Sequence, residues 1–251
     1  MKKINLTLMY IFFVLLTISC SSDSSGNQES GGSSQSDGKG GSLATFALKG
    51  NYLYTVDYQK LNVFNIQNKE NPVKVNQKDV GFNIETLYSL DDYLFIGSRN
   101  GMFIYDVTNP ENPNLLSEAQ HFTACDPVVA NQTHAFVTLH SNTNCGNNLN
   151  TLMVYDIADP RNPELIHQRN LSFPRGLALH DNYLIVCDDE LKIFDITNPA
   201  EPILAKSFNV NFKDVVVYNN VLFAFGEKSV SQYKWTGNDF LTLEQISSLS
   251  Y

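Results

Sequence analysis

The chain has 251 residues, of which 43% are hydrophobic and 12% aromatic, enough apolar material for the core of one or two ordinary domains. Its formal net charge is −9, from 17 basic and 26 acidic residues, and loss of Lys2 and Lys3 with a cleaved leader would bring it to −11. Nucleic-acid backbones and anionic lipid surfaces require basic patches, so this balance argues against a nucleic-acid partner and against adhesion of the folded part to lipid headgroups.

The first twenty residues have the pattern of a lipoprotein signal. Two lysines precede an apolar run, Ile4–Ile18, which is too short and too interrupted for a comfortable transmembrane helix. The segment Thr17–Cys20 resembles the bacterial lipobox, whose cysteine becomes the lipidated first residue of the mature chain, although leucine is usual where Thr17 stands. We therefore predict a signal peptide over residues 1–19 and lipidation of Cys20. An ordinary cleaved signal with an incidental cysteine is the alternative.

A flexible tether is predicted directly after Cys20. Residues 21–42 contain nine serines and six glycines and no large apolar side chain. Such a segment buries too little surface to offset its chain entropy, so we expect it to be disordered. A Gly/Ser coil of this length spans roughly 25 Å. Residues 20–42 would thus hold the body of the chain, residues 43–251, away from a membrane.

A short segment recurs through this body at intervals close to 40 residues. It consists of an aromatic residue, Asp or Asn, Ile or Val, and a polar turn that ends in proline. The copies begin at Phe64, Tyr105, Tyr155 and Phe194, and a degraded copy without prolines begins at Tyr233. The spacings of 41, 50, 39 and 39 residues, the longest with an insertion around residues 142–150, indicate five structural repeats.

Each repeat contains four short β-type runs. In the fourth repeat we place them at residues 176–180, 183–187, 191–196 and 203–208. Asn, Asp and Gly pairs favour a tight hairpin between the first two runs, and proline ends the third because it cannot donate within a sheet. No helical period appears. Five such units predict an all-β fold, a single β-propeller with five four-stranded blades, since separate hairpins would leave unpaired edges.

The strand followed by Asp-Ile/Val-x-Asn-Pro-x-x-Pro resembles the LVIVD-repeat family of bacterial propeller lipoproteins. The clearest copies begin at Tyr105 and Phe194, and the resemblance extends over residues 43–251. It implies a β-propeller at the cell surface. It implies little about activity, because the family has no broadly shared catalytic motif.

Charged side chains are predicted to meet at one mouth of the central channel. Alignment of the repeats on their tight turns places one residue per blade at the entrance of the innermost strand: Ala44, Glu85, Asp126, Arg175 and Lys213. The links between second and third strands emerge on the same face and contribute Asp57, Tyr58, Arg99, His140 and Asp188–Glu190. Ligands often bind where loops converge on a rigid scaffold, so we predict a binding mouth formed by Glu85, Arg99, Asp126, His140, Arg175, Asp188 and Lys213.

Two other interpretations of this mouth stay open. The charges could form a solvated rim of weak ion pairs. The Asp188–Glu190 run could hold a calcium ion, because hard cations take several oxygen ligands, but its spacing matches no calcium loop. We assign no metal ion and no cofactor.

The cysteines predict one disulfide. Cys125 begins the inner strand of the third repeat and Cys145 lies in the inserted loop of the same repeat, so both map to one face of one blade. In an oxidising compartment we expect them to form a bridge worth about 3 kcal/mol. Cys187 lies in an apolar strand and is expected to be a buried free thiol. No Cys-x-x-Cys or His-x-x-x-His pair points to zinc.

No catalytic motif is evident: Gly-x-Ser-x-Gly and phosphate-binding glycine loops are absent from the sequence. We therefore predict a non-enzymatic binding or scaffold module of the bacterial cell envelope. Its lipid anchor would hold it in the outer membrane, on either face, and its partner would be an envelope protein or glycan. One alternative is an envelope enzyme that acts on carbohydrate with a carboxylate pair such as Glu85 and Asp126. The other is a structural subunit of an envelope complex.

Overall fold

Each repeat folds into a four-stranded antiparallel sheet in the computed structural model, which describes residues 40–120, 127–140, 149–236 and 241–251. These residues belong to one unit, Gln35–Tyr251. Blade 1 contains β1 (Phe46–Lys49), β2 (Tyr52–Val56), β3 (Lys60–Asn65) and β4 (Val73–Asp79). Blade 2 contains β5 (Ile84–Leu90), β6 (Tyr93–Ser98), β7 (Gly101–Asp106) and β8 (Asn114–Gln120). Blade 3 contains β9 (Val128–Ala130), β10 (His134–Leu139), β11 (Thr151–Asp156) and β12 (Glu164–Asn170).

Blades 4 and 5 complete the series of five sheets. Blade 4 contains β13 (Leu177–His180), β14 (Tyr183–Cys187), β15 (Leu191–Asp195) and β16 (Ile203–Phe208). Blade 5 contains β17 (Asp214–Tyr218), β18 (Val221–Phe225), β19 (Ser229–Trp235) and β20 (Leu243–Ser250). The described ranges contain no helix, and therefore none able to cross a membrane.

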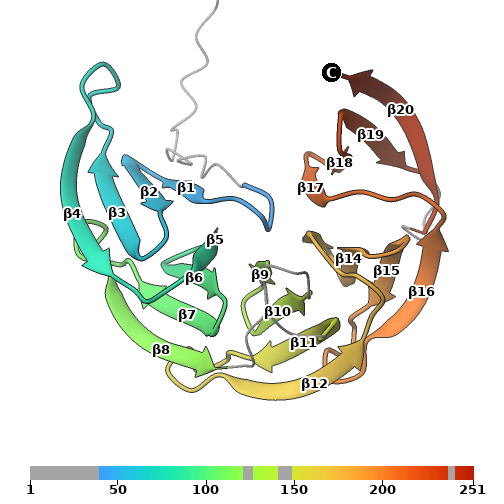
Figure 1. The fold of residues 1–251 in the computed structure, drawn as a ribbon, viewed down its shortest axis with the longest axis horizontal. Helices are drawn as coiled ribbons and strands as arrows, with labels where there is room; N and C mark the ends of the chain where they lie inside the picture. Colours follow the sequence, from blue (N-terminus) through green and yellow to red (C-terminus); the bar gives the residue numbers. More distant parts are fainter. Residues whose placement is uncertain (1–39, 121–126, 141–148, 237–240) are drawn as a thin grey trace, which may run out of the picture. The chain divides into compact units, whose positions relative to one another are not determined.

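The five sheets follow one another around a central axis (Figure 1). The first strand of each blade lies innermost and the fourth lies at the rim. This arrangement confirms the predicted all-β propeller with five four-stranded blades.

The predicted hairpin turns adopt the backbone that their residues favour. The φ angles of Asp91, Asp181 and Asn219 are 47°, 49° and 48°, and that of Gly50 is 55°. Asn, Asp and Gly tolerate this left-handed region, which two-residue hairpins require. The turn residues therefore fix the register of the first strand pair in these blades.

The recurring Asp or Asn at the end of the third strand forms a side-chain turn. Its side-chain oxygen accepts a hydrogen bond from the backbone N–H two residues later. The donor–acceptor pairs are Gln67–Asn65 (2.9 Å), Thr108–Asp106 (2.7 Å), Ala158–Asp156 (2.9 Å) and Thr197–Asp195 (2.8 Å). Every blade then shows a register shift at the same place between its third and fourth strands.

The same turn also accepts a hydrogen bond from the preceding blade, which we call the latch. Three donors occupy equivalent positions on the fourth strands of blades 1–3. The latches are Asn76 Nδ2 to Glu111 O (2.6 Å), Ser117 Oγ to Pro160 O (2.6 Å) and His167 Nδ1 to Ala200 O (3.0 Å). The repeated turn thus joins neighbouring blades near the rim.

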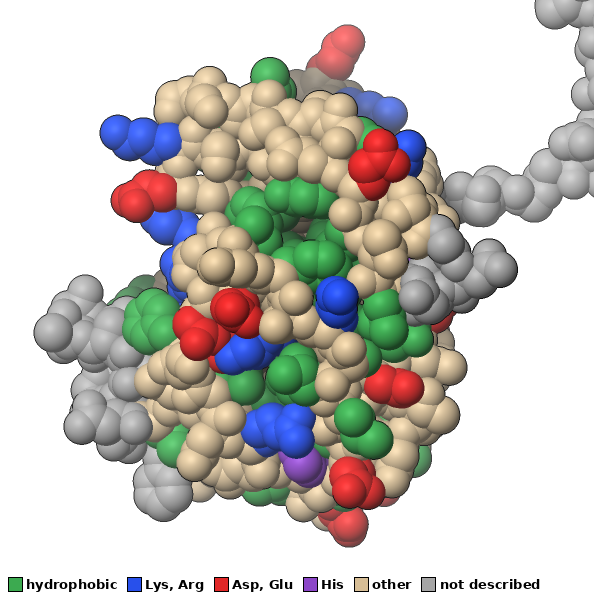
Figure 2. Space-filling view, turned by 90° about the vertical axis from the view of Figure 1, so that its right-hand side faces the viewer, with side chains coloured by type: hydrophobic (Ala, Val, Ile, Leu, Met, Phe, Trp, Pro, Cys, Tyr) green, Lys and Arg blue, Asp and Glu red, His purple; other side chains and the backbone are tan. Residues whose placement is uncertain are grey.

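Four hydrophobic clusters hold the blades together, and each joins two consecutive blades. They lie between blades 1 and 2, 2 and 3, 3 and 4, and 4 and 5. Among the described residues no such cluster joins blade 5 to blade 1, and Figure 1 shows the ring open there. Figure 2, which views the side of β16 and β20, shows charged groups interspersed with hydrophobic side chains. The apolar side chains exposed on these two strands include Ile203, Leu204 and Ile246.

Of the cysteines with a predicted role, Cys187 alone lies within the described residues. Cys187 is a fully buried free thiol, as predicted, and its burial raises the pKa of that thiol. Cys125 and Cys145 lie outside the described residues, so their disulfide stays a prediction. The signal peptide, Cys20 and most of the tether also lie outside them.

Candidate functional site

The predicted channel mouth divides into several local contacts. Glu85 and Arg99, both from blade 2, form an ion pair with Nε and Oε1 3.3 Å apart. Burial raises the pKa of Glu85, and the guanidinium opposes that shift. Lys213 forms an exposed ion pair with Glu227 at 3.7 Å. Asp126 lies outside the described residues.

His140 and Arg175 meet around the ring of Phe173. The imidazole packs edge-on against this ring at 5.4 Å between centroids, and the guanidinium carbon lies 5.6 Å from its centroid. Burial, followed by the charge of Arg175, lowers the pKa of His140. Arg175 also donates to Asn211 Oδ1. The structure therefore brings these two predicted residues together on one aromatic side chain.

Asp188 is held in place by backbone hydrogen bonds and by an ion pair. Its side chain is fully buried and accepts hydrogen bonds from the backbone N–H groups of Ser172 and Phe173. Lys192 Nζ lies 2.6 Å from a carboxylate oxygen of Asp188 and 2.6 Å from one of Asp189. This ammonium lowers the pKa of Asp189 to about 2.

The ammonium of Lys192 pairs with two of the three carboxylates in the acidic run, those of Asp188 and Asp189. Within the described ranges no group of three or more His, Cys, Asp or Glu residues could hold a metal ion. The Asp188–Glu190 run thus fixes the link that precedes β13.

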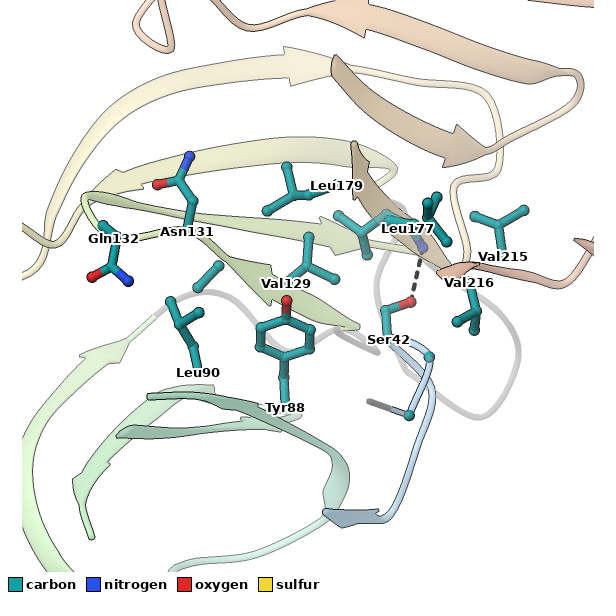
Figure 3. Close-up of a pocket in the computed structure, with 15 residues that line it drawn as sticks. Ser42, Tyr88, Leu90, Val129, Asn131, Gln132, Leu177, Leu179, Val215 and Val216 are labelled. Atoms are coloured by element: carbon teal, nitrogen blue, oxygen red, sulfur yellow. Dashed lines mark hydrogen bonds between the residues drawn. The ribbon is translucent and has the colours of Figure 1, made fainter. Parts of the chain in front are cut away.

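A pocket of about 250 Å³ lies inside the channel, between the innermost strands (Figure 3). Its walls come from β5, β9, β13 and β17 and from Gly40–Ser42, a segment that we call the strap. No side chain that lines it is charged. The lining residues are Gly40, Gly41, Ser42, Tyr88, Leu90, Val129, Ala130, Asn131, Gln132, Leu177, Ala178, Leu179, Val215, Val216 and Val217.

The strap crosses from blade 1 to blades 4 and 5. Ser42 Oγ donates to Asp214 Oδ1 at 3.0 Å and accepts from the backbone N–H of Leu177 at 2.8 Å. Ser42 is buried, and a Cβ on Gly41 would overlap the Asp214 carboxylate. Burial raises the pKa of Asp214 to about 6, against the effect of the hydrogen bonds that its carboxylate accepts from the backbone N–H of Val215 and from Ser42. The last residues of the expected tether, Gly40–Ser42, are therefore packed against the propeller.

Tyr88 supplies a polar group to the pocket. Burial raises its pKa to about 12, and its hydroxyl has no hydrogen bond to any described residue. Figure 3 shows this side chain projecting toward Val129. Asn131 uses its Oδ1 for the backbone N–H groups of Thr133 and His134. The pocket thus combines apolar walls with neutral hydrogen-bonding groups.

The binding mouth at the rim of the channel stays a prediction, and the sequence analysis missed this pocket. A signal was present in the repeat alignment. Tyr88 lies four residues before Asp92, and small or aliphatic residues occupy that position in the other blades: Ala47, Val129, Ala178 and Val216. A single aromatic hydroxyl among four apolar side chains marks one side of the channel.

The fold and its repeats define a five-bladed β-propeller. The model of the LVIVD repeat matches residues 40–78, 89–120 and 175–210. This five-bladed propeller therefore contains LVIVD repeats in blades 1, 2 and 4, in agreement with the resemblance.

The other comparisons show the fold alone. No curated protein matches the chain. The periplasmic gluconolactonase PpgL of Pseudomonas aeruginosa is 12% identical, with a TM-score of 0.62, over 80% of this chain and 68% of that one. A protein from Lactobacillus plantarum is 11% identical, with a TM-score of 0.64, over 79% and 67%. BamB from Moraxella catarrhalis is 12% identical, with a TM-score of 0.55, over 72% and 54%.

Proposed function

We propose that this protein is a non-catalytic binding module of the bacterial cell envelope that holds a small neutral molecule in its central pocket. The observation that carries the proposal is the hydroxyl of Tyr88, which has no hydrogen bond to a described residue, in a pocket with no charged lining residue. Burying an unpaired charge there would cost far more than burying a neutral polar group, which Tyr88 can satisfy. The volume lies below the roughly 300–1,000 Å³ of pockets for drug-sized ligands, so the ligand is compact.

The envelope location rests on the N-terminal pattern. Lipidation of Cys20 would anchor the chain, and the tether would lead directly into the strap that lines the pocket. PpgL, which shares the fold, is described as periplasmic, in agreement with export. The corresponding test replaces Cys20 by serine in the full chain and follows detergent-phase partitioning. Retention of Cys20→Ser in the detergent phase would contradict lipid anchoring.

An enzymatic role finds less support at the predicted mouth. Glu85 is paired with Arg99 in its own blade, and no lining residue of the pocket is a carboxylate or a histidine. PpgL is named as an enzyme, but a likeness at 12% identity carries no activity to this chain.

Three probes with one ring and different charges test the pocket: benzamide, benzoate and benzylamine. In ligand-observed NMR we expect saturation transfer to benzamide, and little to the two charged probes. Tyr88→Phe should weaken benzamide binding about three- to tenfold, because one hydrogen bond contributes about 0.5–1.5 kcal/mol. The matched control is Tyr58→Phe, which changes an exposed tyrosine outside the pocket. Equal binding of all three probes, or of none, would overturn the proposal.

A further inference from the structure

The open side between blade 5 and blade 1, which we call the seam, presents two faces of the kind that other blades bury. We use front face for the side of a blade that meets the preceding blade and back face for the side that meets the next. Within the described residues, no blade packs on the front face of blade 1 or on the back face of blade 5. The described residues form four hydrophobic clusters between five blades, and none of these clusters lies at the seam. The two faces at the seam therefore lack the packing partner that the other faces have.

The front face of blade 1 is less buried than its equivalents. Phe46 is 48% exposed, and Leu53 and Thr55 are partly exposed. The residues at these three positions in blades 2–5 are no more than 2% exposed. They are Leu87, Val128, Leu177 and Val215; Leu94, Ala135, Leu184 and Leu222; and Ile96, Val137, Val186 and Ala224.

The back face of blade 5 is likewise less buried than the equivalent faces of the other blades. Phe223 and Val230 are partly exposed, and Leu249, the cross-strand partner of Val230, is 70% exposed. The corresponding residues of blades 1–4 are no more than 1% exposed. They are Tyr54, Phe95, Phe136 and Ile185 for the first position, and Leu61, Met102, Leu152 and Leu191 for the second.

Asn62, a polar residue on the front face of blade 1, is satisfied within its own blade. Asn62 stands where Phe103 lies in blade 2, and it accepts hydrogen bonds from Lys74 Nζ (2.7 Å) and Gln77 Nε2 (2.8 Å). Its own amide donates to Asp57 at 3.1 Å. A partner that covers this face therefore leaves no unpaired amide at Asn62.

The latch is also incomplete at the seam. Ser247 occupies the position of Asn76, Ser117 and His167 on the fourth strand of blade 5, and it is exposed, with no hydrogen bond from its side chain to a described residue. The turn of blade 1 around residues 66–72 receives no latch from any residue that the structure describes. A donor and an acceptor of the repeating interface thus stand free on the two sides.

We infer that the seam binds one further four-stranded β-sheet blade, supplied by a partner protein. We infer a blade as the partner because the seam resembles the interfaces between the other blades. Each of its two faces has the apolar pattern and the latch group that contact a neighbouring blade elsewhere in the ring. The strap ties blades 1 and 5 through Ser42 and Asp214 near the axis and leaves the seam open toward the rim. PpgL and the L. plantarum protein, of which this chain spans 68% and 67%, hold additional polypeptide beyond the matched blades.

The experiment supplies such a blade by fusion. A copy of residues 171–208, which contains blade 4 and the link before it, is placed after Tyr251 of the full chain. If the seam fits a blade, thermal unfolding of the fusion shifts upward by at least about 5 °C, because two apolar faces become buried. Binding of a hydrophobic dye falls at the same time. An unchanged Tm, or an appended segment that is digested by protease while residues 40–251 survive, would overturn the inference.

Matched variants of the fusion test whether the added blade binds at the seam. Phe64 aligns with Tyr105, which packs against the preceding blade, and so lies on the front face of blade 1. Phe64→Asp on this face and Phe223→Asp on the back face should each remove most of the upward shift in the fusion. Leu115→Asp, at an exposed site on β8, should leave the shift intact. Equal shifts in all three variants would show that the added blade binds elsewhere, against the inference.

Two measurements on the unfused chain test the alternatives to a partner's blade, namely a second copy of the chain and direct closure of blade 1 on blade 5. A concentration-dependent dimer that Phe64→Asp abolishes would identify a second copy as the partner and contradict the proposal. Quantitative disulfide formation in a Phe64→Cys, Phe223→Cys variant would show that blades 1 and 5 close on each other, which also contradicts it. A monomer without that crosslink is the expected result. None of these readouts depends on the ligand of the central pocket.

Discussion

The hydroxyl of Ser42 and the carboxylate of Asp214 lie 3.0 Å apart although 172 positions separate them in the chain. The contact joins the segment that enters the propeller to the first residue of its last blade. Because no apolar cluster of the described residues connects blade 5 to blade 1, this hydrogen bond is an important tie between the two ends of the ring.

Replacement of Ser42 by alanine should therefore destabilise the propeller. The variant leaves the buried Leu177 N–H without an acceptor and removes one donor to Asp214, at a cost of about 1–3 kcal/mol. Urea denaturation of the purified full chain measures the change. Ser247→Ala, at an exposed site, is the control and should alter the free energy of unfolding by less than about 0.5 kcal/mol. Equal stabilities of the two variants would contradict the role of the strap.

Asp214 makes stability depend on pH in a defined direction. Its folded pKa, about 6, lies above the ordinary value of 3.8, so the folded state holds the proton more tightly than the unfolded state. The stabilisation is fully present below about pH 4 and is lost as the pH rises through about 6. Asp214→Asn should remove this slope, and the difference from the native chain should change by on the order of 2–3 kcal/mol between pH 4 and 7.5. Parallel pH profiles for the two proteins would refute this assignment.

Lys192 should contribute more to the stability of the fold than its position near the surface suggests. It neutralises Asp188, whose side chain is fully buried. Lys192→Met would leave that carboxylate unpaired and should cost about 3–5 kcal/mol. Lys234→Met breaks a pair of similar length, 3.0 Å to Glu244, but both partners are about half exposed, and the cost should stay below about 1 kcal/mol. The two free energies of unfolding, measured in the same buffer, decide whether burial accounts for the difference.

The latch can be tested by comparing equivalent serines. Ser117→Ala removes the hydrogen bond to Pro160 O and should destabilise the chain by about 1 kcal/mol. Ser247→Ala changes the same position of the repeat in blade 5, where no following blade accepts the bond, and should be close to neutral. In the fusion that carries a sixth blade, however, Ser247→Ala should acquire a cost similar to that of Ser117→Ala. A neutral Ser117→Ala would show that the latch contributes nothing.

Features internal to one repeat were predictable from the sequence. The Asn, Asp and Gly pairs specified the hairpins with positive φ, and the apolar strand around Cys187 specified its burial. The period near 40 residues specified four strands per blade. These are local properties, because a turn or a strand of 4–8 residues is governed by neighbours close in the chain.

The channel was predicted less well. Glu85, Arg175 and Lys213 do lie near the entrance of the inner strands, but their charges are engaged by Arg99, Phe173 with Asn211, and Glu227 respectively. Whether a charged rim binds a ligand or pairs internally depends on side-chain distances. Alignment of the repeats gives the level of a residue along the channel and says nothing of its partner.

The sequence by itself determined that the protein is built from blades, how many there are, and which residues turn the chain within each one. Only the tertiary structure decided how the first blade meets the last, that Ser42 reaches Asp214, and that Tyr88 faces a neutral pocket. The reason is the range of the contacts: the repeats record the packing of each blade on its neighbour, whereas closure of the ring and the lining of its axis depend on residues from all five blades at once.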